Sequence, residues 1–260
     1  MRVGRKINEG KTKIVYEDPD IKGTVFLYFK DSITAGDGAK KDEINEKGLI
    51  HWRTNKNIFE LLTFKEGVPT HYIRSPEEGY AEVLRLDKKY DLEIVGRRVA
   101  TGSYLVRHPD AREGDCFNPI VAEFFYKDDE LNDPKLDDSH IAVLKNKNPV
   151  FSESEKLLKK TFCILEDAFA KQKHQLIDIK IEVGEIGGKI VVTDEITADS
   201  LRLWPYAVEN PDFSKKNVLD QLDKSGMKDK QLFREGKSKE IIKRGFEQIA
   251  EMTDSFKYIR

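Results

Sequence analysis

Residues 176–204, LIDIKIEVGEIGGKIVVTDEITADSLRLW, decide the fold of this chain because their pattern predicts one long β-hairpin. The first part alternates apolar and polar residues, as a strand with one buried face does. Gly187-Gly188 supplies the positive φ that a tight turn needs, and the β-branched run at 190–193 predicts the returning strand. The apolar face carries Ile177, Ile179, Ile181 and Val183, and the opposite face carries Asp178, Lys180 and Glu182.

The pairing register of this hairpin is open at the level of sequence. A loop of two or four residues places Glu182 opposite Thr193 and Lys180 opposite Glu195. An odd loop or a β-bulge places Glu182 opposite Asp194 instead. Periodicity therefore does not choose between Asp194 and Glu195 as the acid that would join Glu182 in holding a metal ion.

The charged face of the first strand has two interpretations. It is either a solvated surface, on which Lys180 forms cross-strand ion pairs that stabilise the fold little, or a magnesium–nucleotide site. Mg²⁺ takes one or two carboxylates completed by phosphates and waters, and a lysine between the acids would neutralise a transferring phosphoryl group. The remaining motifs favour the second interpretation.

The composition excludes several classes of protein. The 260 residues are 38% hydrophobic and 35% charged, with a net charge of −2. No broad basic surface for nucleic acid or membrane follows from such a balance. The N-terminus lacks an apolar signal region, no apolar run is long enough to cross a bilayer, and Cys116 and Cys163 stand far apart. We therefore expect a cytoplasmic protein that binds neither nucleic acid nor membranes.

Two glycine-rich segments precede the hairpin. Gly10-Lys11-Thr12-Lys13 lies between predicted strands, so it is not a Walker A loop but is typical of a lid whose amides, Lys11 and Lys13 cover phosphates. An ordinary exposed turn is the alternative. Asp37, held between two glycines after a predicted strand, points into a cleft or merely forms a turn.

A third segment, GRRVATGSYLVRHP, combines hydroxyl groups with three arginines. Arg97, Arg98 and Arg107 flank Thr101-Gly102-Ser103, whose amides and hydroxyls could bind an anion. Arginines on an exposed surface are the alternative. Arg202, which leaves the second strand of the hairpin, is a further candidate for the same anion.

The patterning predicts an α+β protein of two closely packed lobes. Residues 1–86 would form a lobe built on an antiparallel sheet, and residues 87–260 a larger α+β lobe, with a nucleotide cleft between them. Ser152 is predicted to cap a helix, with Glu155 in the capping-box position. Amphipathic patterns predict three helices, with these apolar positions: Ile44, Leu49, Trp52, Phe59 and Leu62; Leu158, Phe162, Leu165 and Phe169; Ile241, Ile242, Phe246, Ile249, Met252 and Phe256.

The ordered motifs resemble the SAICAR synthetase family (phosphoribosylaminoimidazole-succinocarboxamide synthase). The matching blocks, from residue 10 to about 234, are GKTKIVYE, ITAGDGAK, RRVATGSYLVR, FFYKDDELNDP, LIDIKIEVG, DEITADSLRLWP and DKQLFR. The sequences RR-x-ATGS and FF-x-KDD-x-x-NDP resemble the synthetase domain of the animal bifunctional enzymes more closely than the short bacterial form. The resemblance implies a SAICAR synthase-like, ATP-grasp-like fold and an ATP- and Mg²⁺-dependent ligase joining L-aspartate to carboxyaminoimidazole ribotide (CAIR) through an acyl phosphate.

The resemblance also implies a role for each matching residue. Lys11, Lys13 and Lys127 would bind ATP, and Glu182 with Asp194 would hold Mg²⁺, which favours the odd loop or bulge. Lys180 would bridge the γ-phosphate and the CAIR carboxylate. Three residues would clamp the ribotide phosphate, namely Arg97, Ser103 and Arg202, and two would contact the imidazole end, namely Asp37 and Asp178.

Relatives in this family are commonly homo-oligomers, so we expect one here. Two other functions use some of the same motifs. A small-molecule kinase would need the lid and the D-x-K-x-E face but no amine acceptor. A nucleotide sensor would keep the lid and hydrolyse nothing, which the full set Lys180, Glu182, Asp194 and Arg202 argues against.

Overall fold

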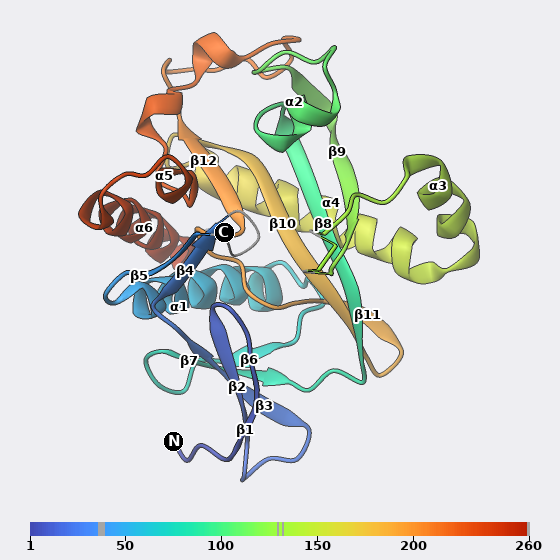
Figure 1. Cartoon of the computed structure of the whole chain (residues 1–260), viewed down its shortest axis with the longest axis vertical. Helices are drawn as coiled ribbons and strands as arrows, with labels where there is room; N and C mark the ends of the chain where they lie inside the picture. Colours follow the sequence, from blue (N-terminus) through green and yellow to red (C-terminus); the bar gives the residue numbers. More distant parts are fainter. Residues whose placement is uncertain (36–39, 129, 132, 259–260) are drawn as a thin grey trace.

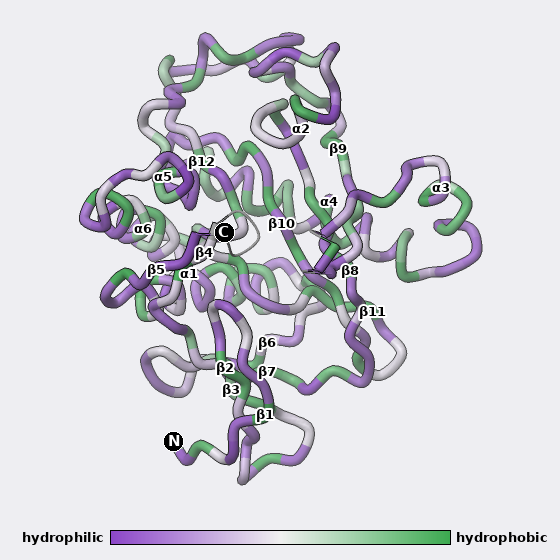
Figure 2. The backbone as a smooth tube through the Cα atoms, in the orientation of Figure 1, coloured by the Kyte–Doolittle hydropathy of each residue, from purple (hydrophilic) through white to green (hydrophobic). Residues whose placement is uncertain are grey.

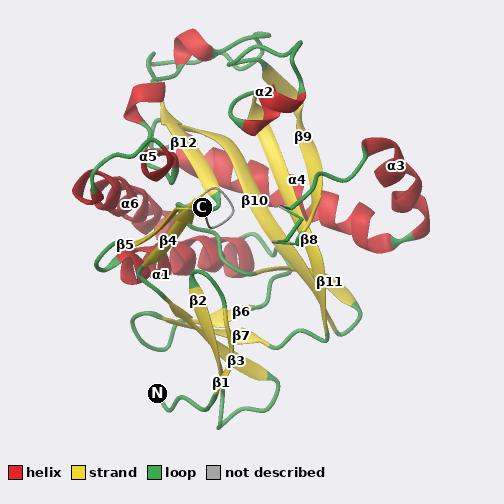
Figure 3. Cartoon of the chain, in the orientation of Figure 1, coloured by secondary structure: helices red, strands yellow, loops and turns green. Residues whose placement is uncertain are grey.

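The computed structural model describes residues 1–35, 40–128, 130–131 and 133–258 as an α+β fold built on antiparallel sheets (Figures 1 and 3). The first sheet has the order β1-β2-β3-β7-β6 and comes from the N-terminal third of the chain. Its strands are β1 (Lys6–Glu9), β2 (Lys13–Glu17), β3 (Thr24–Phe29), β6 (Tyr72–Arg74) and β7 (Tyr80–Leu84).

The second sheet is organised around β10, the long first strand of the predicted hairpin. Strand β8 pairs along one edge of β10, while β11 and β12 pair one after the other along its opposite edge. Strand β9 extends the sheet beyond β8. These strands are β8 (Lys88–Val99), β9 (Cys116–Tyr126), β10 (His174–Ile186), β11 (Lys189–Thr193) and β12 (Leu201–Pro205).

The alternation in β10 sets the layers of this lobe. The four predicted apolar residues are at most 1% exposed, and helix α4 packs against this side of the sheet (Figures 1 and 2). The predicted stripe of α4 is fully buried there. Burying such side chains contributes roughly 1.5–3 kcal/mol each. The helices are α1 (Lys47–Glu60), α2 (Ser103–Arg107), α3 (Asp138–Lys147), α4 (Pro149–Ala170), α5 (Gln231–Arg234) and α6 (Lys239–Asp254).

The hairpin register differs from the one that the family resemblance favoured. Ile186 pairs with Lys189, so the loop has two residues, and Glu182 pairs with Thr193. The inferred odd loop or bulge is wrong because both loop glycines take positive φ (57° and 75°), which a two-residue turn requires. Asp194 instead turns out of the strand with a φ of 62°, a left-handed conformation that re-aims its side chain.

The predicted cap of α4 is also corrected. The cap of α4 is Asn148, whose side chain accepts a hydrogen bond from the Val150 amide at 3.1 Å, and not Ser152. Pro149 explains the earlier start, because a first-turn residue needs no amide donor. Residues 32–35 and 40–43 pair with each other as strands β4 (Ser32–Ala35) and β5 (Lys40–Glu43).

Two positions predicted to be buried are exposed, and each lies in the first turn of its helix. Leu49 is 43% exposed on α1, and Ile241 is 52% exposed on α6. Ile44 is buried, but it precedes α1. Helix α6 packs against α1, so the C-terminus returns to the N-terminal lobe. None of the helices in the described parts of the chain is both long and apolar enough to span a bilayer.

Candidate active site

A cavity of about 840 Å³ is lined by residues of both sheets. Apolar side chains of β2, β3 and β7 form one part of its wall, and charged groups of the second sheet form another. Such a combination suits a ligand with a flat apolar ring and a charged tail. The apolar wall includes Val15, Val25, Leu27 and Val83, and the charged wall includes Glu93, Lys127, Lys180, Glu182 and Asp194.

Lys13 joins the two lobes across this cavity. Its Nζ lies 3.0 Å from Asp194 Oδ1 and 3.1 Å from Glu195 Oε2. Burial opposes the charge of Lys13, but the two carboxylates raise its pKa above the ordinary value. The same arrangement holds the pKa of Asp194 well below its usual range despite burial, because Lys13 and Lys127 lie near it. Lys13 is therefore a cation and Asp194 an anion in the absence of ligand.

Glu182 and Lys180 occupy the neighbouring part of the charged wall. Burial, with the nearby Asp194 charge, raises the pKa of Glu182, while an ion pair with Lys127 opposes that rise. Lys180 Nζ donates to Glu93 Oε1 at 2.5 Å. The two predicted metal ligands therefore lie close enough for their charges to interact, each with a lysine beside it.

The donor set fits magnesium in chemistry and number. Glu182 and Asp194 offer hard carboxylate oxygens, and Mg²⁺ in nucleotide sites uses one or two carboxylates plus phosphate and water. Within the described residues no group of three or more His, Cys, Asp or Glu side chains is arranged to hold a metal ion. A metal here would therefore need oxygens from its ligand, and the role of the two acids stays a prediction.

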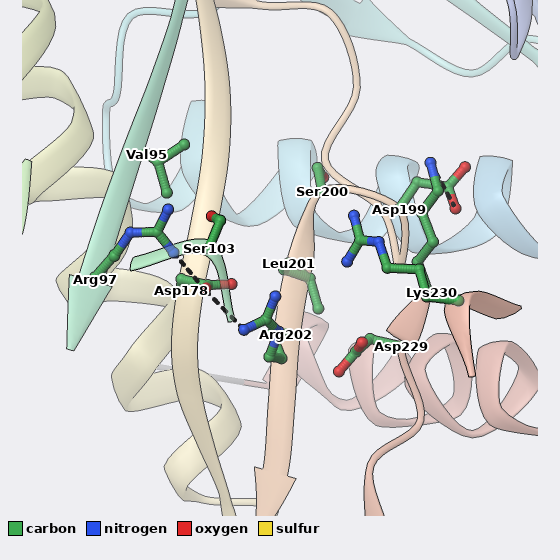
Figure 4. A pocket seen from close by; sticks show the side chains of 11 residues that line it. Val95, Arg97, Ser103, Asp178, Asp199, Ser200, Leu201, Arg202, Asp229 and Lys230 are labelled. Carbon is green, nitrogen blue, oxygen red and sulfur yellow. Dashed lines mark hydrogen bonds and ion pairs between the residues drawn. The ribbon is translucent and has the colours of Figure 1, made fainter. Parts of the chain in front are cut away.

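A second pocket, of about 140 Å³, adjoins the first and is lined by arginines (Figure 4). The β-register places Asp178 opposite Arg97 on one side and Arg202 on the other. Asp178 Oδ2 lies 3.0 Å from Arg97 Nη1 and 3.4 Å from Arg202 Nη1. Ser103, the first residue of α2, completes this side of the pocket. The structure thus brings the three residues predicted for the anion site, Arg97, Ser103 and Arg202, to one pocket, and their role stays a prediction.

Gly102 is required where α2 meets Arg202. Its φ is 57°, and a Cβ atom at this position would lie 3.1 Å from Arg202 Nη1. A side chain here would be both strained and crowded against the guanidinium. The glycine of the T-G-S turn therefore lets Ser103 and Arg202 border the same pocket.

The three arginines of the GRRVATGSYLVRHP segment have different roles. Arg97 Nε donates to Glu123 Oε2 at 2.6 Å, and Arg107 Nη2 lies 2.8 Å from the same oxygen. Arg98 instead pairs with Glu166 at 2.7 Å and does not line the pocket. Successive residues of a strand face opposite ways, which separates Arg97 from Arg98.

The charged face of β10 contributes lining residues to both cavities. Asp178 lines the small pocket, whereas Lys180 and Glu182 line the large one. Lys11, Lys13 and Lys127 line the large cavity as well. Asp37 lies outside the described residues.

The chain matches the family model described as SAICAR synthetase over residues 6–249. It is 39% identical to the phosphoribosylaminoimidazole-succinocarboxamide synthase of Herpetosiphon aurantiacus, with 99% of this chain and 100% of the relative covered. The chain belongs to the SAICAR synthetase family. The resemblance inferred from the motifs is therefore confirmed.

Two further proteins of known name are similar to this chain. The multifunctional protein ADE2 of Gallus gallus is 35% identical, over 98% of this chain and 59% of the longer relative. A solved SAICAR synthetase (Type-2) in complex with ADP is 31% identical, with a TM-score of 0.77 and 97% of each chain covered. The α+β fold expected for the family is confirmed by this likeness.

Sequence reasoning missed several charged residues that line the two cavities. Lys230 and Arg234, in the quoted DKQLFR block, line both cavities but received no role. Asp199 lines both cavities too, and Asp229 lines the small pocket. The four-residue spacing of Lys230 and Arg234 was a usable signal, because residues so spaced share one side of a helical turn.

Proposed function

We propose that this protein is an ATP-dependent ligase that joins L-aspartate to CAIR and yields SAICAR, ADP and phosphate in de novo purine biosynthesis. One observation carries the proposal: a large cavity with apolar and acid–lysine walls adjoins a small arginine pocket, and the two share lining residues. Nucleotide and ribotide phosphate thereby bind side by side. Membership of the SAICAR synthetase family gives the same activity.

The reaction needs activation of a carboxylate. A carboxylate is a poor electrophile, so the γ-phosphoryl group of ATP first passes to the CAIR carboxylate, and the aspartate amine then displaces phosphate. Lys180, on the strand between the two cavities, would stabilise charge on the transferring phosphoryl group. Mg²⁺ held by Glu182 and Asp194 would supply further charge neutralisation at the phosphates.

The nucleotide would occupy the large cavity. Its adenine would pack on the apolar wall of the first sheet, and its phosphates would contact Lys11, Lys13 and Lys127. A solved SAICAR synthetase in complex with ADP supports the binding of a nucleotide by this chain. In this assignment residues 1–86 act as the nucleotide lid, and residues 87–260 carry the catalytic and ribotide groups.

The ribotide would extend from the small pocket toward Lys180. Arg97, Ser103 and Arg202 would bind its 5′-phosphate, since guanidinium forks match phosphate oxygens. Asp178, held between the two arginines, would contact the imidazole end together with Asp37. We further propose a cytoplasmic homo-oligomer, which light scattering after size exclusion would test.

The deciding experiment is an ADP-release assay with CAIR and L-aspartate omitted in turn. We expect full turnover only with both, together with SAICAR formation at one equivalent per ADP. Rapid ADP release with CAIR alone, without a trapped acyl phosphate, would instead identify a kinase. Absence of ADP production under saturating substrates would identify a nucleotide-binding module.

A further inference from the structure

Glu195 lines the large cavity but has no part in the proposed reaction. Its side chain is 8% exposed, and both of its oxygens face the glycine turn (residues 10–13) that follows β1. Oε1 accepts a hydrogen bond from Thr12 Oγ1 at 2.8 Å, and Oε2 lies 3.1 Å from Lys13 Nζ. One side chain of the second lobe therefore contacts two residues of the first lobe in the wall of the nucleotide cavity.

The backbone at Asp194 explains why Glu195 points into this cavity. Successive side chains of a regular strand face opposite sides of a sheet. The φ of 62° at Asp194 breaks that alternation, so Lys13 Nζ also lies 3.0 Å from Asp194 Oδ1. The side chain of Asp194 is 32% exposed and open to a ligand, whereas that of Glu195 is enclosed. The two acids that the hairpin pattern left as alternatives therefore have different surroundings.

Contacts on either side of Glu195 hold its backbone in place. His71 Nε2 lies 3.2 Å from the carbonyl oxygen of Asp194, and the Ile196 amide donates to Asn55 Oδ1 at 3.0 Å. Both His71 and Asn55 are buried. Glu195 is thus a fixed acceptor before any ligand binds.

The glycine turn is attached less firmly to its own lobe. Strand β1 lies at the edge of the first sheet, is exposed at every residue and pairs irregularly with β2. The Gly10 amide donates to the Lys13 carbonyl, and the Lys30 amide donates to the Thr12 carbonyl, each at 2.8 Å. Exposed backbone hydrogen bonds at an edge open locally at a small cost in free energy. A contact from the second lobe therefore changes how much of the time the turn covers the cavity.

We propose that Glu195 is a positioning residue that holds the glycine turn over the phosphates of the bound nucleotide and does not bind the metal ion. The proposal rests on the ligase function proposed above, in which Lys13 contacts these phosphates. When Lys13 exchanges its carboxylates for a phosphate, the hydrogen bond between Thr12 and Glu195 still joins the lobes, because neither group takes part in the exchange. The amides of the turn thereby stay beside the phosphate oxygens.

The first test measures amide hydrogen exchange in residues 10–13 of the full-length protein without ligand. Thr12→Val should speed this exchange about tenfold, because it removes the hydroxyl donor and keeps the side-chain shape. Glu195→Ala should speed it at least as much, and the double variant should exchange no faster than Glu195→Ala, since both changes break the same contact. Glu195→Gln, whose Oε1 can still accept from Thr12, should stay within about threefold of wild type.

Tyr90→Phe is the matched control for the loss of a hydroxyl donor. The Tyr90 hydroxyl donates to Glu185 Oε2 at 2.7 Å, and neither residue lines the large cavity. This variant should leave the exchange of residues 10–13 and the affinity for ADP unchanged.

The second test separates a positioning residue from a metal ligand by calorimetry with ADP, in magnesium and in EDTA. Thr12→Val should raise the Kd for ADP roughly 3–10-fold, by the same factor in both buffers, because the turn covers the cavity for less of the time. The factor by which magnesium tightens ADP binding should stay within about threefold of wild type in Glu195→Gln. Asp194→Asn should abolish most of that factor.

Three outcomes overturn the inference. Unchanged exchange in both Thr12→Val and Glu195→Ala would mean that the contact does not hold the turn, and additive effects in the double variant would mean that the two residues act separately. A loss of the magnesium effect in Glu195→Gln as large as in Asp194→Asn would make Glu195 a metal ligand. If Glu195→Ala fails to fold, Thr12→Val and Glu195→Gln decide the question. The expected exchange and binding without ADP release from ATP, CAIR and aspartate would instead overturn the proposed ligase.

Discussion

The two cavities differ in how their charges are held. In the large cavity, lysines pair with carboxylates from the other lobe or a neighbouring strand, as Lys13 does with Asp194 and Lys180 with Glu93. In the small pocket, Arg97, Asp178 and Arg202 form a row set by strand register within one sheet. A lysine on a flexible stem can exchange a carboxylate for a phosphate, whereas an arginine fork is oriented beforehand.

This contrast suggests that the charged side chains of the two cavities have different roles. If the proposed assignment holds, lysines would carry the charges that must rearrange around a reacting triphosphate, and arginines would carry the charges that recognise an unchanging phosphate. Substitutions in the large cavity should therefore lower kcat, and those in the small pocket should raise the KM for CAIR.

The largest effect is expected at Lys180. Lys180→Ala should lower kcat by about 10²–10³-fold or more while the fold stays intact, because a cation at a transferring phosphoryl group is worth several kcal/mol. Steady-state kinetics and circular dichroism measure the two parts. Lys189→Ala, on an exposed residue of the same hairpin, is the control. Near-normal ligation by Lys180→Ala would remove this residue from its role.

Two buried groups, one from each cavity, predict opposite effects of pH on stability. Burial lowers the pKa of His71, in the large cavity, to about 4, so its contribution to stability falls as pH drops from about 6.5 to 4. Burial raises the pKa of Asp229, in the small pocket, to about 6, so its contribution falls as pH rises from about 4 to 6. Each could reach about 3 kcal/mol in the free energy of unfolding.

Urea unfolding between about pH 4 and 6.5 would separate these two groups. Relative to wild type, His71→Gln should lose less stability on acidification, and Asp229→Asn should lose less as pH rises. The prediction is contradicted if either variant loses more stability than wild type over its pH range. It is also contradicted if the free energy of unfolding depends on pH in the same way in wild type and both variants.

An intermediate effect is expected at Arg202. Arg202→Ala should raise the KM for CAIR by roughly 30-fold with little change in the KM for ATP, because charge-assisted hydrogen bonds to phosphate are lost. Kinetics with each substrate varied in turn would measure both constants. An effect on ATP alone would contradict the phosphate clamp and remove the contrast between the cavities.

The smallest effect is expected from Glu123→Gln. This change weakens the hydrogen bonds by which Glu123 orients Arg97 and Arg107, and Glu123 itself is not proposed to contact the substrate. The KM for CAIR should therefore rise only about 3–10-fold. Glu166→Gln weakens the corresponding ion pair between Glu166 and Arg98, and it should leave the KM for CAIR unchanged. Equal effects of the two variants would mean that pairing of the arginines matters for stability alone.

Part of the candidate site could be predicted from the sequence because three of its residues lie on one strand, β10. A period of two places Asp178, Lys180 and Glu182 on one face by local geometry alone, and the opposite face is buried as expected. The glycine pair likewise predicted the turn. The order of motifs was enough to identify the family, and the family supplied the ribotide and nucleotide candidates.

Tertiary structure decided what local periodicity does not encode. The alternation of β10 is compatible with either register, and only the folded turn, with the left-handed backbone at Asp194, fixed where the second acid lies. Lys47 and Asp199 are separated by 152 positions in the chain and meet only when α1 packs beside the segment that joins β11 to β12. Residue spacing along a strand or helix is a local property, whereas a buried charge pair depends on how distant segments pack.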